Sequence, residues 1–186
     1  MTALPVLVVV SGPPGSGKTT LAHRLAAAIG CPAICRDEIK EGMAHTVPGF
    51  TAGPGDELTR RTNPVFFAVL DLLLRAGVTT VAEAAFQDRV WRPRLEPLRD
   101  LARIRVVHCH VGAGVAAARI IRRAQDNPLR RAHPGPRGQA EREATHRAFR
   151  PVSIDAPALD VDTEDGYRPP FGQILSFIQP GLIPNE

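Results

Sequence analysis

Residues 4–20 have the sequence LPVLVVVSGPPGSGKTT, and this stretch decides the fold. Its first part, Leu4–Val10, is apolar and rich in valine, which is typical of a buried parallel strand. Its second part, residues 12–19, matches the pattern G-x-x-x-x-G-K-[ST] and leads into helical spacing over Lys18–Ile29. A strand, a glycine-rich loop and a helix in this order are the context in which the pattern forms a phosphate-binding loop.

The chemistry of the loop explains its spacing. Glycines let the backbone curl so that successive N–H groups point at phosphate oxygens, and the following helix adds its positive dipole end. Lys18 is expected to reach the β- and γ-phosphates, and the Thr19 hydroxyl to ligate Mg²⁺. The residues expected to hold a nucleoside triphosphate are Gly12, Pro13, Pro14, Gly15, Ser16, Gly17, Lys18, Thr19 and Thr20.

Strands alternate with helices along the rest of the chain. Further strands are expected at 33–35, 78–82, 104–111 and 159–161, and helices at 58–75, 91–101, 113–125, 139–149 and 171–178. The helix 58–75 is expected to be interrupted, or to restart, at Pro64. The alternation predicts an α/β, three-layer fold with a five-stranded parallel sheet and helices on both faces. No repeat or linker divides residues 1–186, so a single domain is expected.

The composition is that of an ordinary globular domain, with 44% hydrophobic and 23% charged residues. No apolar run reaches the roughly 18–20 residues that span a bilayer, and the run 4–10 lacks the basic leader of a signal peptide. Three cysteines at 31, 35 and 109 form no disulfide framework, and a core role is favoured over a metal or redox role. The expected compartment is the cytoplasm.

Positive charge is concentrated in one segment. Residues 89–150 contain 15 basic and 5 acidic side chains, a net charge of +10 within a chain of net charge +4, and every basic residue there is arginine. The arginine fork matches phosphate oxygens two at a time, so the segment suits a small phosphorylated ligand or nucleic acid. Only 1 Trp, 1 Tyr and 7 Phe are available for base stacking, which favours the small ligand.

A carboxylate ends the second apolar strand of the chain. Glu83 lies where the ligand sites of α/β proteins form, at the carboxyl end of a buried strand. A buried carboxylate is costly unless it is paired or near a metal, so Glu83 is expected beside Mg²⁺ or the acceptor, with helix capping as the alternative. No N-K-x-D guanine signature occurs, which argues against a switch GTPase.

Four features together resemble the P-loop kinase family. They are the loop GPPGSGKTT, the triplet Arg36-Asp37-Glu38, the segment Glu83-Ala84-Ala85-Phe86, and the arginine-rich helix with its following loop. The family includes polynucleotide kinase, gluconate kinase, chloramphenicol phosphotransferase and zeta-toxin-type kinases. The resemblance spans nearly the whole chain and implies a P-loop NTPase fold. It also implies transfer of the γ-phosphate of ATP, with Mg²⁺, to a hydroxyl group.

The resemblance also implies roles for single residues. Asp37 would accept the proton of the acceptor hydroxyl, in agreement with its place after a strand expected to adjoin strand 4–10, and capping of its helix is a compatible role. Arg119 and Arg123 share a helix face and would flank the nucleotide, one stacking on adenine and one reaching phosphate. Arg130 would bring positive charge from an arginine-rich lid at about 127–138. Lys18 and Arg123 join Asp37 and Arg130 in the expected catalytic set.

The acceptor is expected to bind between the loop at about 42–58, with Phe50, and the helical segment bearing Arg89, Trp91 and Arg92. Contacts with it are expected from Arg36, Asp37, Lys40, Glu83 and Arg89. A natural product or antibiotic, a nucleoside and a sugar-like compound all fit as small-molecule acceptors.

Two other functions stay open: a kinase of nucleic-acid 5′-hydroxyl ends, and a nucleotide-binding ATPase or regulator without an acceptor. His108 and His110 share a strand face, where a core role is favoured over a metal pair.

Overall fold

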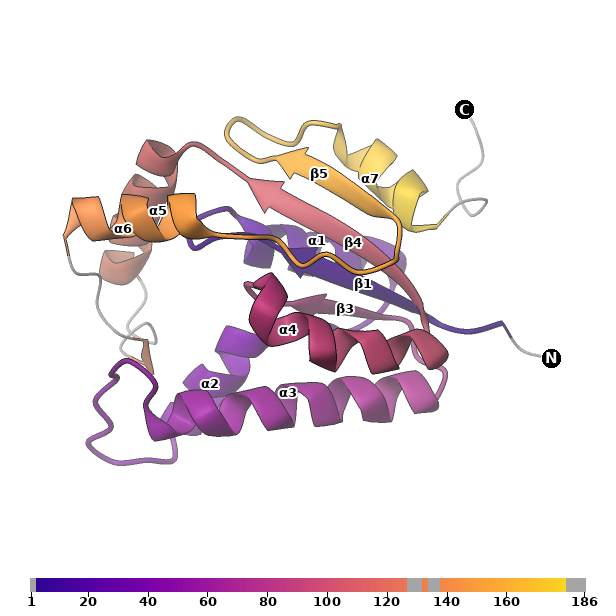
Figure 1. Cartoon of the computed structure of the whole chain (residues 1–186), viewed down its shortest axis with the longest axis horizontal. Coiled ribbons are helices and arrows are strands. Elements are labelled where there is room, and N and C mark those ends of the chain that lie inside the picture. The colour runs from indigo at the N-terminus through magenta and orange to yellow at the C-terminus, as the bar shows by residue number, and fades with distance from the viewer. Residues whose placement is uncertain (1–2, 127–131, 134–137, 180–186) are drawn as a thin grey trace.

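The computed structural model describes residues 3–126, 132–133 and 138–179. Five strands, all paired in parallel, form one sheet in the order β2-β3-β1-β4-β5. The strands are β1 (Val6–Ser11), β2 (Ala33–Cys35), β3 (Thr80–Glu83), β4 (Arg103–His110) and β5 (Ala158–Asp162). Helices lie on both faces of this sheet (Figure 1), which confirms the expected α/β, P-loop NTPase architecture.

The helices surround the sheet. They are α1 (Lys18–Ile29), α2 (Arg36–Ala44), α3 (Glu57–Arg75), α4 (Asp88–Leu95), the 3₁₀ helix η1 (Glu96–Asp100), α5 (Ala113–Asp126), α6 (Gln139–Ala148) and α7 (Phe171–Ile178). Helices α1 and α7 cover one face of the sheet and α3 and α4 the other, while α5 and α6 lie beyond the carboxyl end of β4 (Figure 1). Among the described helices, none is both long and apolar enough to cross a membrane.

The central strand β1 is buried on both faces, as its uninterrupted apolar run predicts. Leu7 and Val9 pack into the cluster beneath α3 and α4 with Phe66. Val8 alternates with them and packs with Leu21 of α1 on the opposite face. All five side chains are fully buried, and each contributes roughly 1.5–3 kcal/mol through burial of apolar surface. This strand therefore holds the loop that follows it at a fixed place on the sheet edge.

Helix α3 differs from the expected interruption at Pro64. It runs without a break from Glu57 to Arg75 with Pro64 inside it. Asp56 caps its first turn by accepting a hydrogen bond from the Thr59 N–H at 2.7 Å. The side chains that α3 buries include Phe66 and Leu70, which are four residues apart and therefore lie on one helix face. Packing of this face against the sheet keeps the helix continuous, although Pro64 has no N–H to donate to the helical hydrogen bonds.

The order of the strands corrects one expectation about Asp37. Strand β2, which precedes Asp37, does not adjoin β1, because β3 lies between them. The chain passes over one strand position after α1 and fills it later with Thr80–Glu83. Glu83 is consequently the residue that ends the strand next to the phosphate-binding loop, while Asp37 starts α2 one strand further out.

Most of the expected lid lies outside the described residues. This includes Arg130, so the expected catalytic contact of that residue stays a prediction. The described part of the segment consists of Ala132, His133 and Gly138. The expected acceptor-side loop is shorter than 42–58, since α2 continues to Ala44 and α3 begins at Glu57.

Candidate functional site

The phosphate-binding loop is built so that backbone, rather than side chains, faces the ligand. Gly17 occupies the N-cap position of α1 with φ 73°, in the left-handed region that favours glycine. A Cβ added to Gly15 would lie 2.5 Å from the Ala116 carbonyl oxygen, so the loop and α5 approach too closely for a side chain. The first turn of α1 contains no acidic residue and its N-cap offers no side-chain oxygen. Its N–H groups and dipole are therefore suited to a phosphate.

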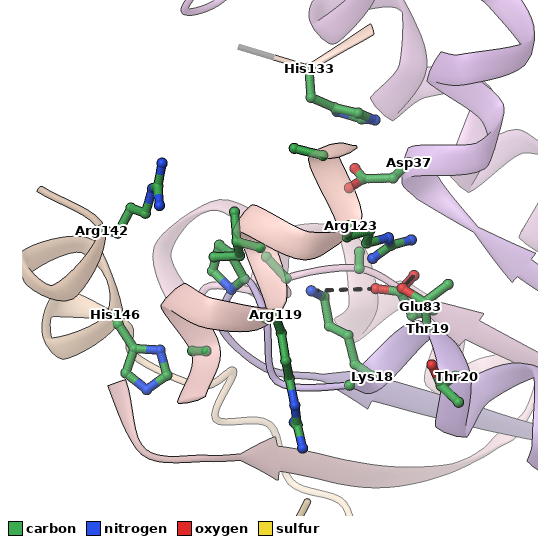
Figure 2. A pocket seen from close by; sticks show the side chains of 18 of the residues that line it. Lys18, Thr19, Thr20, Asp37, Glu83, Arg119, Arg123, His133, Arg142 and His146 are labelled. Carbon is green, nitrogen blue, oxygen red and sulfur yellow. Dashed lines mark hydrogen bonds and ion pairs between the residues drawn. The ribbon is translucent and has the colours of Figure 1, made fainter. Parts of the chain in front are cut away.

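The two side chains expected at the phosphates and metal meet a common carboxylate. Lys18 Nζ lies 3.8 Å from Glu83 Oε1, and the Thr19 hydroxyl donates to Glu83 Oε2 at 3.0 Å (Figure 2). The Glu83 side chain is 3% exposed and that of Lys18 is 14% exposed. A hydroxyl and a carboxylate are the hard oxygen ligands that Mg²⁺ takes, so Thr19 and Glu83 fit a magnesium ion beside the loop.

Burial is the main influence on the charge of Glu83. It raises the pKa of this carboxyl, opposed mainly by the positive charge of Lys18, whereas the charge of Asp37 raises it further. The positive charge of Arg123 also favours the ionised form. Two carboxylates and two cations therefore influence one another across the same site, as at a centre that handles phosphate charge.

Asp37 faces the same cavity from the start of α2. Burial alone would raise the pKa of this carboxyl, but the charges of His133, Lys18 and Arg36, with a hydrogen bond from Arg36, lower it to about 2. The Arg36 guanidinium donates to Asp37 Oδ1 at 3.0 Å and to Asn63 Oδ1 at 3.0 Å. Asp37 is therefore an ionised acceptor of hydrogen bonds, held by a guanidinium that α3 anchors in turn.

Arg119 ties α5 to the segment after β5. Its guanidinium donates to the carbonyl oxygens of Thr163 at 2.7 Å and of Glu164 at 3.1 Å. The Thr163 hydroxyl in turn donates to the carbonyl of Ser16 at 2.8 Å. Arg119 thus reaches the phosphate-binding loop through Thr163 and braces the nucleotide side of the cavity. The expected flanking of the nucleotide by Arg119 and Arg123 stays a prediction.

Most of the residues expected in the site line one cavity of about 2070 Å³. Ligand pockets commonly measure about 300–1,000 Å³, so this one has room for a nucleotide and a second substrate. The expected residues that line it are Pro14, Gly15, Gly17, Lys18, Thr19, Thr20, Arg36, Asp37, Glu83, Arg119 and Arg123. Gly12, Pro13 and Ser16 were expected to contact the nucleotide as well, but they are buried behind this surface and do not line the cavity.

Two further expected contacts differ from the structure. Lys40 was expected to touch the acceptor, but it is 1% exposed, its ammonium pairs with Asp56 at 2.7 Å, and it does not line the cavity. Arg89 was also expected there, but it lies exposed on α4 and does not line the cavity. The helical period explains Arg89, which is two residues from Trp91 and therefore lies on the opposite face of α4. Lys40 is three residues from Asp37, on nearly the same face of α2, and its ion pair with Asp56 keeps its ammonium out of the cavity.

The sequence did not identify His133 as a residue of the site. His133 lies against α2, with Nε2 3.1 Å from Glu41 Oε1, and its charge acts on Asp37. Figure 2 shows its ring on the same side of the cavity as Asp37. A histidine within an arginine-rich loop was the only available signal. Thr163 also lines the cavity, just after the carboxyl end of β5, where the sites of parallel sheets form.

The histidines and cysteines differ partly from their expected roles. His108 and His110 belong to no group of metal-ligating side chains within the part of the chain that the structure describes. Cys109 and Cys35 are buried, which agrees with a core position. Cys35, however, lies in a group with His23 and Glu38 whose ligand atoms are all within 4.8 Å of one another.

The fold and this site together define a nucleotide-binding protein with the P-loop kinase fold. The AAA domain family matches residues 7–152, and the chain belongs to that family. A search of curated proteins finds no match.

Solved structures share the whole architecture. A candidate kinase from Chloroflexus aurantiacus is 22% identical with a TM-score of 0.85, over 97% of this chain and 100% of that one. A sugar kinase from Janibacter is 21% identical with a TM-score of 0.64, over 96% and 97%. Kti12 from Chaetomium thermophilum, in complex with ADP-AlF3, is 20% identical with a TM-score of 0.64, over 94% and 99%. At these identities the likeness establishes the fold, and it confirms the resemblance to P-loop kinases.

Proposed function

We propose that this protein transfers the γ-phosphate of ATP, with Mg²⁺, to a hydroxyl group of a small molecule. The observation that carries the proposal is the placement of Asp37. Its ionised carboxylate shares one cavity with Lys18 and Glu83, close enough for their charges to act on one another. A hydroxyl that donates a hydrogen bond to Asp37 would be directed toward the phosphate held by the loop.

Each residue of the site would have its own role in this transfer. Lys18 and Arg123 would offset negative charge on the transferring group, and Thr19 with Glu83 would hold the magnesium ion. The acceptor oxygen forms a bond to the γ-phosphorus as the bond from that phosphorus to ADP breaks, and Asp37 receives the hydroxyl proton. A carboxyl with a pKa of about 2 is a weak base, so Asp37 would act mainly by orienting the hydroxyl. A phosphate bound to Lys18 would offset the charge of that lysine, so the pKa of Asp37 would then rise.

The acceptor side favours a compound with an apolar body. Phe50, Ala52 and Pro54 line the cavity from the loop after α2, Ala84 from the segment after β3, and Trp91 from α4. The sugar kinase among the matched structures is consistent with a small acceptor. The ADP-AlF3 complex of the Kti12 structure is consistent with an adenine nucleotide in the loop.

A kinase of nucleic-acid 5′-hydroxyl ends is the second candidate. The net charge of +10 over residues 89–150 favours it. It predicts oligonucleotide binding that weakens steeply with salt, because Arg–phosphate contacts release counterions. The free thiols of Cys31, Cys35 and Cys109 support a reducing compartment such as the cytoplasm for either kinase.

The test is ADP release from ATP–Mg²⁺ across a panel of hydroxyl compounds and 5′-hydroxyl oligonucleotides. We expect a small molecule to stimulate release, and Asp37→Asn to lower the stimulated rate by about 10²–10⁴-fold while nucleotide affinity is kept. Asp71→Asn is the matched control, since the Asp71 side chain is about half exposed on α3 and pairs there with Arg75. Full stimulated turnover in Asp37→Asn would refute the role of Asp37. Slow ADP release that no acceptor accelerates would favour an ATPase or regulator instead.

A further inference from the structure

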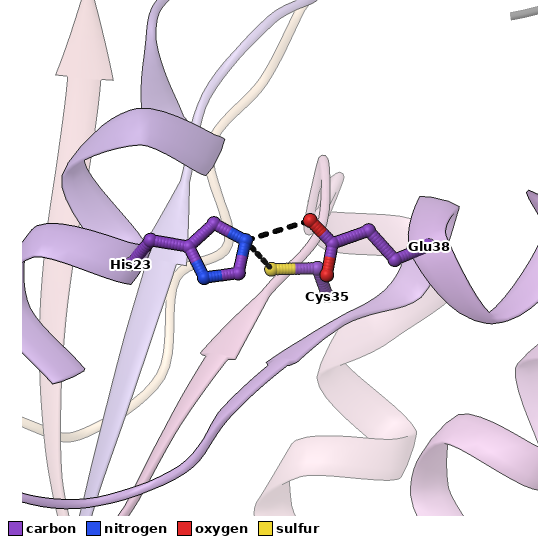
Figure 3. Close-up of side chains that lie close together, drawn as sticks. All are labelled: His23, Cys35 and Glu38. Carbon is purple, nitrogen blue, oxygen red and sulfur yellow. Dashed lines mark hydrogen bonds and ion pairs between the residues drawn. The ribbon is translucent and has the colours of Figure 1, made fainter. Parts of the chain in front are cut away.

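His23, Cys35 and Glu38 form a compact group beside the cavity, at the end of β2, where Cys35 pairs in register with Glu83 of β3. His23 projects from α1, Cys35 ends β2, and Glu38 lies in the first turn of α2 (Figure 3). His23 Nε2 lies 2.6 Å from Glu38 Oε1 and 3.6 Å from Cys35 Sγ. Three secondary-structure elements therefore direct an imidazole, a thiol and a carboxylate at one point.

We propose that these three side chains bind a zinc ion, or a transition-metal ion of similar chemistry, at a site separate from that of the nucleotide's magnesium. The ligand set identifies the class of metal. Sulfur and imidazole nitrogen favour zinc and its neighbours, whereas Mg²⁺ takes oxygen ligands. Catalytic zinc sites commonly have three protein ligands and an open fourth position.

The spacing of the ligand atoms fits such an ion. A tetrahedral zinc with bonds of about 2.3 Å to sulfur and about 2.05 Å to nitrogen separates these two atoms by about 3.5 Å, and the observed distance between Cys35 Sγ and His23 Nε2 is 3.6 Å. The same geometry separates nitrogen and oxygen by about 3.4 Å, which is wider than the observed hydrogen bond of 2.6 Å. The Glu38 side chain is 45% exposed, so it has room to rotate outward by this difference.

The surroundings give the site a buried anchor and an open side. Cys35 is 2% exposed, whereas His23 and Glu38 line the cavity. The fourth ligand position would therefore face the cavity, where water or a polar group of a second substrate can fill it. A bound ion would displace the proton of the Cys35 thiol.

Cobalt provides a direct test with the full chain after its metals are removed by chelation. We expect one equivalent of Co²⁺ to bind with a sulfur-to-metal charge-transfer absorption, and Zn²⁺ to displace it, since zinc binds such sites more tightly. His23→Ala and Glu38→Gln should each weaken binding by about 10–100-fold or more. Both residues are about half exposed, so these variants are expected to fold. Cys35→Ala should abolish the charge-transfer band.

Cys31→Ser is the matched control, because Cys31 is a second, partly exposed thiol just before β2. It should keep the cobalt spectrum and affinity of the wild type. The proposal is overturned if the wild type gives no thiolate band, if His23→Ala and Glu38→Gln bind cobalt as tightly as the wild type, or if Cys31→Ser also loses the band. The titration contains no nucleotide or acceptor, so its outcome is independent of whether the protein is a kinase.

Discussion

Thr19 donates its hydroxyl hydrogen to Glu83 across 3.0 Å, joining the start of α1 to the end of β3 over 64 positions of sequence. The sheet creates this contact, because β3 pairs with β1 and places Glu83 opposite Val10, just before the phosphate-binding loop. The same carboxylate lies 3.8 Å from Lys18 Nζ. Glu83 is thus the point at which the loop lysine and the expected magnesium ligand meet.

Glu83→Gln should weaken the binding of magnesium. The amide keeps the shape of the side chain but removes the negative charge, so the Mg²⁺ concentration for half-maximal ADP release should rise by about 10–100-fold. Glu57→Gln, at an exposed position of α3, should leave it unchanged. Titration of magnesium at fixed ATP measures the effect, and an unaltered dependence in Glu83→Gln would remove Glu83 from the metal site.

Arg119→Ala should loosen the nucleotide side of the cavity. It leaves the carbonyl groups of Thr163 and Glu164 without this donor, which should lower the free energy of unfolding by about 1–3 kcal/mol. We also expect the KM for ATP to rise by a larger factor than kcat falls. The reason is that Arg119 supports the phosphate-binding loop on the nucleotide side of the cavity rather than on the acceptor side. Urea unfolding and steady-state kinetics test this, with Arg99→Ala, at an exposed ion pair, as the control. A fall in kcat alone would contradict the bracing role.

The ion pair between Lys40 and Asp56 should make stability depend on pH in the acid range. Burial would raise the pKa of Asp56, but hydrogen bonds from Lys40 and from the Thr59 and Gly53 N–H groups lower it to about 2. The folded-state pKa is below the unfolded value of about 3.9, so this stabilisation is complete above about pH 4 and is lost as the pH falls toward 2.

Asp56→Asn should reduce the free energy of unfolding at pH 7 by about 3 kcal/mol, because Lys40 is 1% exposed and would lose its partner. The variant should also lose the part of the acid dependence that Asp56 contributes. Chemical unfolding at several pH values measures both effects. Asp155→Asn, at a side chain that is 91% exposed, should change stability by less than about 0.5 kcal/mol. Equal effects of the two substitutions would contradict a special role for the buried pair.

Trp91 should report on binding at the acceptor side. It is the only tryptophan of the chain, is 7% exposed, lines the cavity, and packs against Phe86 with ring centroids 5.0 Å apart. An acceptor that stimulates turnover should therefore shift or quench its emission in a saturable way, without any need for ATP. Trp91→Phe should abolish the signal. A true acceptor that leaves the emission unchanged would place the acceptor elsewhere in the cavity.

Much of the fold could be predicted because its signals are local. The apolar run of β1, the glycine pattern of residues 12–19 and the helical spacing that follows lie within a few turns of one another. Each element is selected by the residues within it, so their order alone indicated a parallel sheet with helices on both faces. The Pro64 expectation failed because packing of α3 against the sheet outweighs the local preference of one residue.

The sequence by itself determined the phosphate-binding loop, the strand–helix alternation and the carboxylate at the end of a buried strand. Only the tertiary structure decided that β3 separates β2 from β1, and that Lys40 is buried in an ion pair with Asp56. The tertiary structure alone also brings the side chains of His23, Cys35 and Glu38 close together. The physical reason is that strand order and contacts between distant elements depend on how whole faces pack. A loop motif needs only its own backbone and the helix that follows it.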